Sequence, residues 1–123
     1  MTHVLVTRPK DASQQLADML GVHDLEPMVM PMYTFTAKKP AFDVNSVWSD
    51  KQLRRLAVFT STRAVEFGIP YLPAPGHLGA IEIAVIGSST GAKLHDSGYP
   101  VHLQARSGFT TEDLLQLPQL AQK

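Results

Sequence analysis

Short apolar runs that end in small polar residues constrain the fold of this chain more than any other feature. The runs cover residues 4–6, 56–59 and 81–86, and threonine, serine or glycine follows each of them. Such runs are typical of strands that are buried on both faces of a sheet. A helical pattern of apolar residues follows each run, which predicts parallel strands joined by right-handed crossovers. The predicted fold class is therefore α/β, a parallel sheet with flanking helices.

The remaining segments fit this alternation of strands and helices. Asp11 is predicted to cap a helix that ends before Gly21, and Gly98 to close a helix over residues 91–97. Thr110 or Thr111 is predicted to cap a last helix that Pro118 ends. Three less regular segments are a strand over residues 28–30, an amphipathic helix within 41–55 and a strand over 101–103.

The composition excludes several classes of protein. The chain has 123 residues, enough for one compact domain or a piece of a larger protein. Its 11 Lys and Arg residues balance 11 Asp and Glu residues, which argues against a nucleic-acid-binding protein. No cysteine is present and the 5 histidines lack metal-ligand spacing, so we expect no disulfide and no metal site. Since neither a secretory signal nor a membrane-spanning stretch is recognised, we expect a cytoplasmic protein with no membrane partner.

The polar residues after the strands are the candidate binding site. Open parallel sheets bind their ligands beyond the carboxyl ends of the strands, where the strand-to-helix turns lie. The candidate residues there are Arg8, Thr60, Ser61, Arg63, Ser88, Ser89 and Thr90. Residues 107–111 form a further candidate turn. Helix-terminal N–H groups and small hydroxyls favour an anionic ligand, although ordinary helix capping also explains these residue types.

Two enzyme motifs overlap residues 87–93, and both are poorly supported. Residues 87–91 match the G-x-S-x-G pattern of hydrolases, which would make Ser89 a nucleophile. Asp96 and His102 follow Ser89 in the required order, but Asp96 lies ~10 Å along the same predicted helix, toward the opposite edge of the sheet. Lys93 suggests a phosphate-binding loop, but the spacing of the glycines and the residue after the lysine do not match.

Several short motifs occur in one order along nearly the whole chain. They comprise residues 4–9, Pro31, residues 58–66, residues 84–87 with Thr90 and residues 92–94, residues 98–101 and residues 111–115. The most specific is Phe59-Thr60-Ser61 followed by Ala64-Val65. In this order the motifs resemble the amino-terminal half of the uroporphyrinogen-III synthase family. Members of that family are longer, so we expect this chain to be a truncated form or fragment.

The resemblance implies a domain organisation. It implies two flavodoxin-like α/β domains joined by a ribbon, with the active cleft between them. Residues 1–35 would form a strand-helix-strand piece of the first domain, and residues 36–123 most of the second, so that both are incomplete. The complete protein is expected to be a monomer. We expect the fragment either to fold its first strand and helix onto its own sheet or to exchange them with another copy in a swapped dimer.

The resemblance also implies a reaction that needs no cofactor. Linear hydroxymethylbilane, a small molecule with eight carboxylates, loses water, its terminal ring is inverted, and the ring closes as uroporphyrinogen III in haem biosynthesis. The family's tyrosine, a proton donor, belongs to the second half, so no catalytic residue is assigned here and the fragment alone is expected to be inactive. The alternative is a non-catalytic flavodoxin-like module that binds an anionic ligand or a partner.

Overall fold

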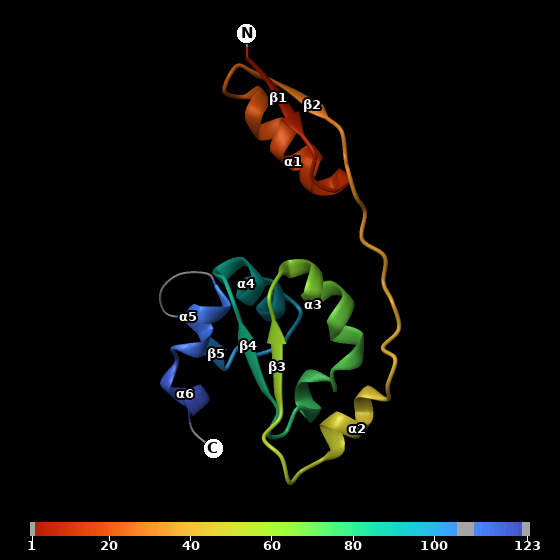
Figure 1. Cartoon of the computed structure of the whole chain (residues 1–123), viewed down its shortest axis with the longest axis vertical. Helices are drawn as coiled ribbons and strands as arrows, with labels where there is room; N and C mark the ends of the chain where they lie inside the picture. Colours follow the sequence, from red (N-terminus) through yellow and green to blue (C-terminus); the bar gives the residue numbers. More distant parts are fainter. Residues whose placement is uncertain (1, 106–109, 122–123) are drawn as a thin grey trace. The chain divides into compact units, whose positions relative to one another are not determined.

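The computed structural model of the chain describes residues 2–105 and 110–121. The chain divides into two compact units, Met1–Lys39 and Pro40–Lys123, which are described separately below (Figure 1). The predicted assignment of residues 1–35 and 36–123 to two domains of the family stays a prediction.

The smaller unit is a strand, a helix and a second strand. β1 (Thr2–Val6) pairs in parallel with β2 (Leu25–Val29), and α1 (Lys10–Gly21) connects them. Ala17 of α1 and Val6 of β1 are buried. The predicted cap at Asp11 is wrong, because the N-cap position belongs to Pro9 and Asp11 lies in the first turn of α1. A carboxylate there still interacts favourably with the positive end of the helix.

The larger unit has one parallel sheet of three strands, in the order β3-β4-β5. The strands are β3 (Leu56–Phe59), β4 (Glu82–Val85) and β5 (Leu103–Gln104). The helices are α2 (Val44–Ser49), α3 (Thr62–Gly68), α4 (Ser88–Asp96), α5 (Thr111–Leu115) and α6 (Pro118–Ala121), with 3-10 turns η1 (Ile69–Tyr71) and η2 (Pro75–His77) between α3 and β4. The predicted α/β class with parallel strands and flanking helices is confirmed.

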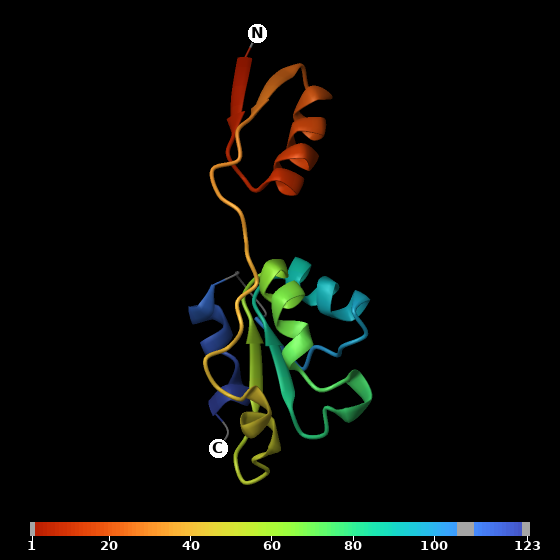
Figure 2. The ribbon, with the colours of Figure 1, turned by 90° about the vertical axis from the view of Figure 1, so that its right-hand side faces the viewer.

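The central strand β4 is buried on both faces of the sheet, whereas Val58 of β3 is exposed. Successive residues of a strand point to opposite faces, so Ile83 and Val85 of β4 join one apolar cluster while Ala84 joins the other. The first cluster includes Leu94 of α4, and the second includes Leu114 of α5. Figure 2 shows α3 and α4 on one side of the sheet and α5 and α6 on the other.

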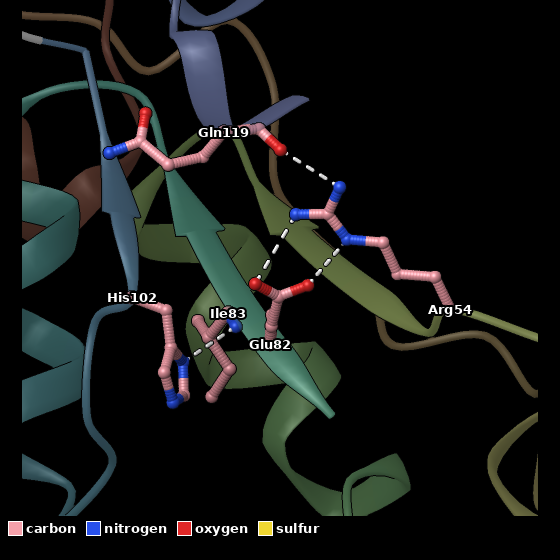
Figure 3. Close-up of polar contacts among 5 residues, drawn as sticks. All are labelled: Arg54, Glu82, Ile83, His102 and Gln119. Carbon is pink, nitrogen blue, oxygen red and sulfur yellow. Dashed lines mark hydrogen bonds and ion pairs between the residues drawn. The ribbon is translucent and has the colours of Figure 1, made fainter. Parts of the chain in front are cut away.

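Polar contacts join β4 to its neighbours at the amino end of the strand (Figure 3). The Arg54 guanidinium donates to the Glu82 carboxylate, with an Nε–Oε2 distance of 2.6 Å, and to the carbonyl oxygen of Gln119 at 2.8 Å. The hydrogen bond from Arg54 lowers the pKa of Glu82. The Ile83 N–H donates to Nδ1 of His102 at 2.9 Å. These contacts link β4 to α6 and to the segment before β5.

Several element boundaries differ from the sequence predictions. The helix predicted within residues 41–55 is Val44–Ser49, the strand predicted over 28–30 is Leu25–Val29, and the strand predicted over 101–103 is Leu103–Gln104. Pro118 begins α6 instead of ending the preceding helix. Proline is suited to a first helical position, because its fixed φ is helical and its missing N–H would have no partner there.

Candidate functional site

The carboxyl ends of β3 and β4 open onto one cavity of about 480 Å³. Its lining consists of Thr60, Ser61, Thr62, Ile86, Gly87, Ser88, Ser89 and Thr90. Five of the seven predicted binding residues are among them: Thr60, Ser61, Ser88, Ser89 and Thr90. Two segments far apart in the sequence meet here because β3 and β4 pair in parallel register, with Phe59 opposite Val85. Thr62 was missed, although it continues the hydroxyl-bearing run of Thr60 and Ser61.

The first side of the cavity is the turn from β3 into α3. Ser61 has an extended backbone, with φ −158° and ψ 162°, and is the N-cap of α3. Its hydroxyl oxygen accepts a hydrogen bond from the Ala64 N–H at 3.0 Å. Helix capping therefore explains one role of this side chain, as the sequence analysis allowed for the residues in these turns. A serine hydroxyl that accepts one hydrogen bond can also donate one, so Ser61 can cap the helix and contact a ligand together.

The second side of the cavity is the turn from β4 into α4. Gly87 is the N-cap of α4 with φ 88°, a conformation that favours glycine. The helix begins at Ser88, three residues before the predicted start at Gly91, so the candidate residues Ser88 to Thr90 form its first turn. Ser88 and Ser89 are exposed, whereas Thr90 is only 3% exposed. The first N–H groups of a helix have no partner within it, and they add donors to this side.

The contacts of Arg63 include other residues of α3. Arg63 is not among the residues that line the cavity. Its guanidinium donates to the Glu66 carboxylate at 2.9 Å and lies 6.0 Å from the centre of the Phe67 ring. The same carboxylate lies 3.6 Å from the Lys93 ammonium, so that Glu66 links α3 to α4. The role of Arg63 in ligand binding stays a prediction.

Arg8 belongs to the smaller unit, and Thr110 of the last candidate turn is not among the described residues that line this cavity. Arg8 follows β1 in the smaller unit, where its carbonyl oxygen accepts from the Ser13 hydroxyl. Its predicted role is not tested by this geometry. In the turn predicted over residues 107–111, residues 107–109 lie outside the described part of the chain. Thr110 caps α5 reciprocally with Asp113, and its hydrogen bonds lower the pKa of that carboxyl.

The described lining of the cavity contains no Asp, Glu or His, which a serine triad or a metal centre would need. Ser89 and Asp96 lie at opposite ends of α4, which excludes the serine triad that the G-x-S-x-G pattern suggested. Over residues 2–105 and 110–121, no three His, Asp or Glu side chains gather as metal ligands would. Among these same residues, no helix has the length and apolar character needed to span a membrane.

The parallel sheet with flanking helices makes the chain an α/β protein, and its hydroxyl-lined cavity lies at the edge where open parallel sheets bind their ligands. A family model described as uroporphyrinogen-III synthase HemD matches residues 4–123. The chain therefore belongs to the uroporphyrinogen-III synthase family, as its motifs predicted. A comparison with curated proteins found no match.

Solved structures agree with this fold. The chain is similar to the crystal structure of uroporphyrinogen-III synthetase from Helicobacter pylori 26695, with a TM-score of 0.74 and 20% identity over 97% of this chain and 53% of that one. It is also similar to a crystal structure of uroporphyrinogen III synthase from the extremely thermophilic bacterium Thermus thermophilus, with a TM-score of 0.51 and 22% identity over 96% of this chain and 48% of that one. The chain thus spans about half the length of these proteins.

Proposed function

We propose that this chain forms part of a uroporphyrinogen-III synthase and that its hydroxyl-lined cavity binds carboxylates of hydroxymethylbilane. In this reaction the linear tetrapyrrole loses its hydroxyl as water, its terminal ring is inverted and the ring closes as uroporphyrinogen III. The observation that carries the proposal is the cavity itself, which gathers five of the predicted residues in a chain of this family. A cytoplasmic, monomeric complete protein that uses no cofactor belongs to the same proposal and rests on the family resemblance.

The chemistry of the lining suits an anion held by neutral donors. Hydroxyls of Thr60, Ser88 and Ser89 and the N–H groups at the start of α4 can donate to carboxylate oxygens. None of the described lining residues is a lysine or an arginine. Hydrogen bonds to an ionised acceptor are stronger than neutral ones. Carboxylates can therefore be held here without a basic surface, consistent with equal numbers of acidic and basic residues in the chain.

The contribution of this cavity to catalysis is binding and orientation. The described lining residues include no group that titrates near neutral pH, so no general acid or base is assigned to them. Holding a flexible chain in a ring-closing conformation removes much of the entropic barrier to cyclisation. The N–H groups of α4 also stabilise negative charge, such as that on a departing hydroxide.

The test adds negative charge to the cavity. We expect Ser88→Asp with Ser89→Asp to lower the kcat/KM for type III product about tenfold or more, because like charges oppose binding of a polycarboxylate. Aspartate in the first turn of a helix is favourable, so the loss is expected with an unchanged unfolding midpoint. Ser46→Asp, on the exposed first turn of α2, is the control and should retain activity. The complete protein that contains this chain is assayed.

The outcomes distinguish the proposal from its alternative. Wild-type yield of type III product in the double variant contradicts a role for this side of the cavity. If hydroxymethylbilane binds and the complete protein forms no type III product, the alternative of a non-catalytic module that binds an anionic ligand is favoured.

A further inference from the structure

A second cavity of about 480 Å³ lies at the other end of the same strands. It is lined by residues of α2 and by residues just before β3 and β4, whereas the hydroxyl-lined cavity is lined by residues that follow these strands. Lys51, Arg55 and His77 contribute its polar groups, and the described lining contains no Asp or Glu. Trp48 and Pro73 are part of its apolar wall. All the ionisable groups in the described lining are thus basic.

The adjacent residues Arg54 and Arg55 differ in whether a carboxylate balances their charge. Arg54 is neutralised by Glu82, as Figure 3 shows. Arg55 instead donates from Nη1 to the uncharged carbonyl oxygen of Trp48, and its Nε–H is buried with no hydrogen-bond partner among the described residues. A buried donor without an acceptor is costly, and a guanidinium is most stable beside an anion. Among the described residues, Arg55 has no carboxylate acceptor such as Glu82 provides for Arg54.

Lys51 and His77 add to this excess of basic groups. Both side chains are exposed, and neither forms an ion pair with any residue in the described ranges. The nearest acidic residue along the chain, Asp50, accepts a hydrogen bond from the Gln52 N–H at 3.0 Å and is not part of the lining. No carboxylate in the described lining therefore offsets the charge of Lys51 and Arg55.

We propose that this cavity binds a small oxyanion, a phosphate or a carboxylate, between Lys51, Arg55 and His77. The arginine supplies planar donors that match an oxyanion, and the lysine supplies a compact positive charge. The volume exceeds that of a simple oxyanion, so that the apolar wall at Trp48 can contact the carbon part of a larger ligand. This site is separate from the proposed synthase cavity and does not depend on it.

Trp48 gives a local signal for the test. It is the single tryptophan of the chain, it lines the cavity, and its indole N–H donates to the Tyr71 carbonyl oxygen at 2.7 Å. The full chain is titrated with sodium phosphate and, separately, with sodium acetate, while its tryptophan emission is recorded. Sodium chloride at equal ionic strength is the blank. We expect a saturable change with phosphate or acetate and none with chloride. The probe that saturates identifies the class of oxyanion.

The variants establish where the anion binds. Lys51→Gln with His77→Gln is expected to raise the dissociation constant about tenfold or more, because the ammonium group of Lys51 and the imidazole donor of His77 are both lost. These side chains are exposed, so the fold is retained even where Arg55→Gln disturbs it. Lys10→Gln, in the smaller unit, is the matched control and should bind as wild type does. No saturable change, an equal change with chloride, or unaltered affinity in the double variant overturns the proposal.

Discussion

The two units of the chain apply the same strand-and-helix pattern with different degrees of burial. In the larger unit, helices cover both faces of the sheet, and Ile83, Val85 and Leu94 are fully buried. In the smaller unit, a single helix accompanies two strands, and the register partners Leu5 and Met28 are 55% and 53% exposed. A two-stranded sheet with one helix is too small to bury much apolar surface. The local sequence pattern is thus sufficient to form strands and helices in both units, whereas extensive burial requires helices on both faces of the sheet.

The largest expected change in unfolding free energy comes from shortening a buried side chain in the larger unit. Leu94→Ala should destabilise the larger unit by about 2–5 kcal/mol, because it leaves a cavity in a closely packed cluster. Met19→Ala, at a position on α1 that is 66% exposed, should change the unfolding free energy by less than about 0.5 kcal/mol. Urea denaturation followed by tryptophan emission measures the first, and circular dichroism the second. Similar losses in both variants would remove the contrast.

Replacing a glycine by alanine is expected to change stability by an intermediate amount, as a loss in the larger unit and as no change or a gain in the smaller unit. Gly87→Ala should cost about 1–3 kcal/mol, because φ 88° is strained for any residue with a Cβ. Gly21→Ala, at the end of α1, should be neutral or stabilise by up to about 1 kcal/mol, because a Cβ there meets nothing within 4 Å. Thermal unfolding of both variants measures these changes. A stable Gly87→Ala protein would contradict the role of this glycine at the start of α4.

Removing an ion pair is expected to change stability least, and the size of the change depends on pH. Hydrogen bonding to Arg54 lowers the pKa of Glu82 in the folded protein. The resulting stability is present above the pKa of the unfolded chain and is lost as pH falls through the folded pKa. Glu82→Gln should therefore lower stability near neutral pH and flatten its decline in acid.

A matched pair in the smaller unit provides the control. Glu26 lies 3.2 Å from His3, and both side chains are more than half exposed. Exposed ion pairs contribute little, so Glu26→Gln should leave the unfolding curve unchanged near neutral pH. Denaturation midpoints measured from neutral to acidic pH test both variants. An unchanged pH dependence in Glu82→Gln would show that the Arg54 contact contributes no stability.

Part of the candidate site was predictable from sequence because strand ends are local features. The apolar run of β3 stops at Phe59, so Thr60 and Ser61 were placed at its carboxyl end correctly. The environment of Arg63 was not predictable in this way, because it depends on whether the guanidinium contacts Glu66 or a ligand. The start of α4 at Ser88 was missed because Gly87 adopts a positive φ that no neighbouring residue indicates.

The sequence alone determined the α/β class and the positions of the main strands, because a strand buried on both faces requires an uninterrupted apolar run. Tertiary structure decided which of these strands became neighbours. Pairing of β3 with β4 brings Ser61 and Ser88 to one cavity and gathers Lys51, Arg55 and His77 around another. It also gives Arg54 a carboxylate partner, whereas Arg55 has none among the residues that the structure describes. Such outcomes depend on contacts between residues far apart in the chain, which no local pattern encodes.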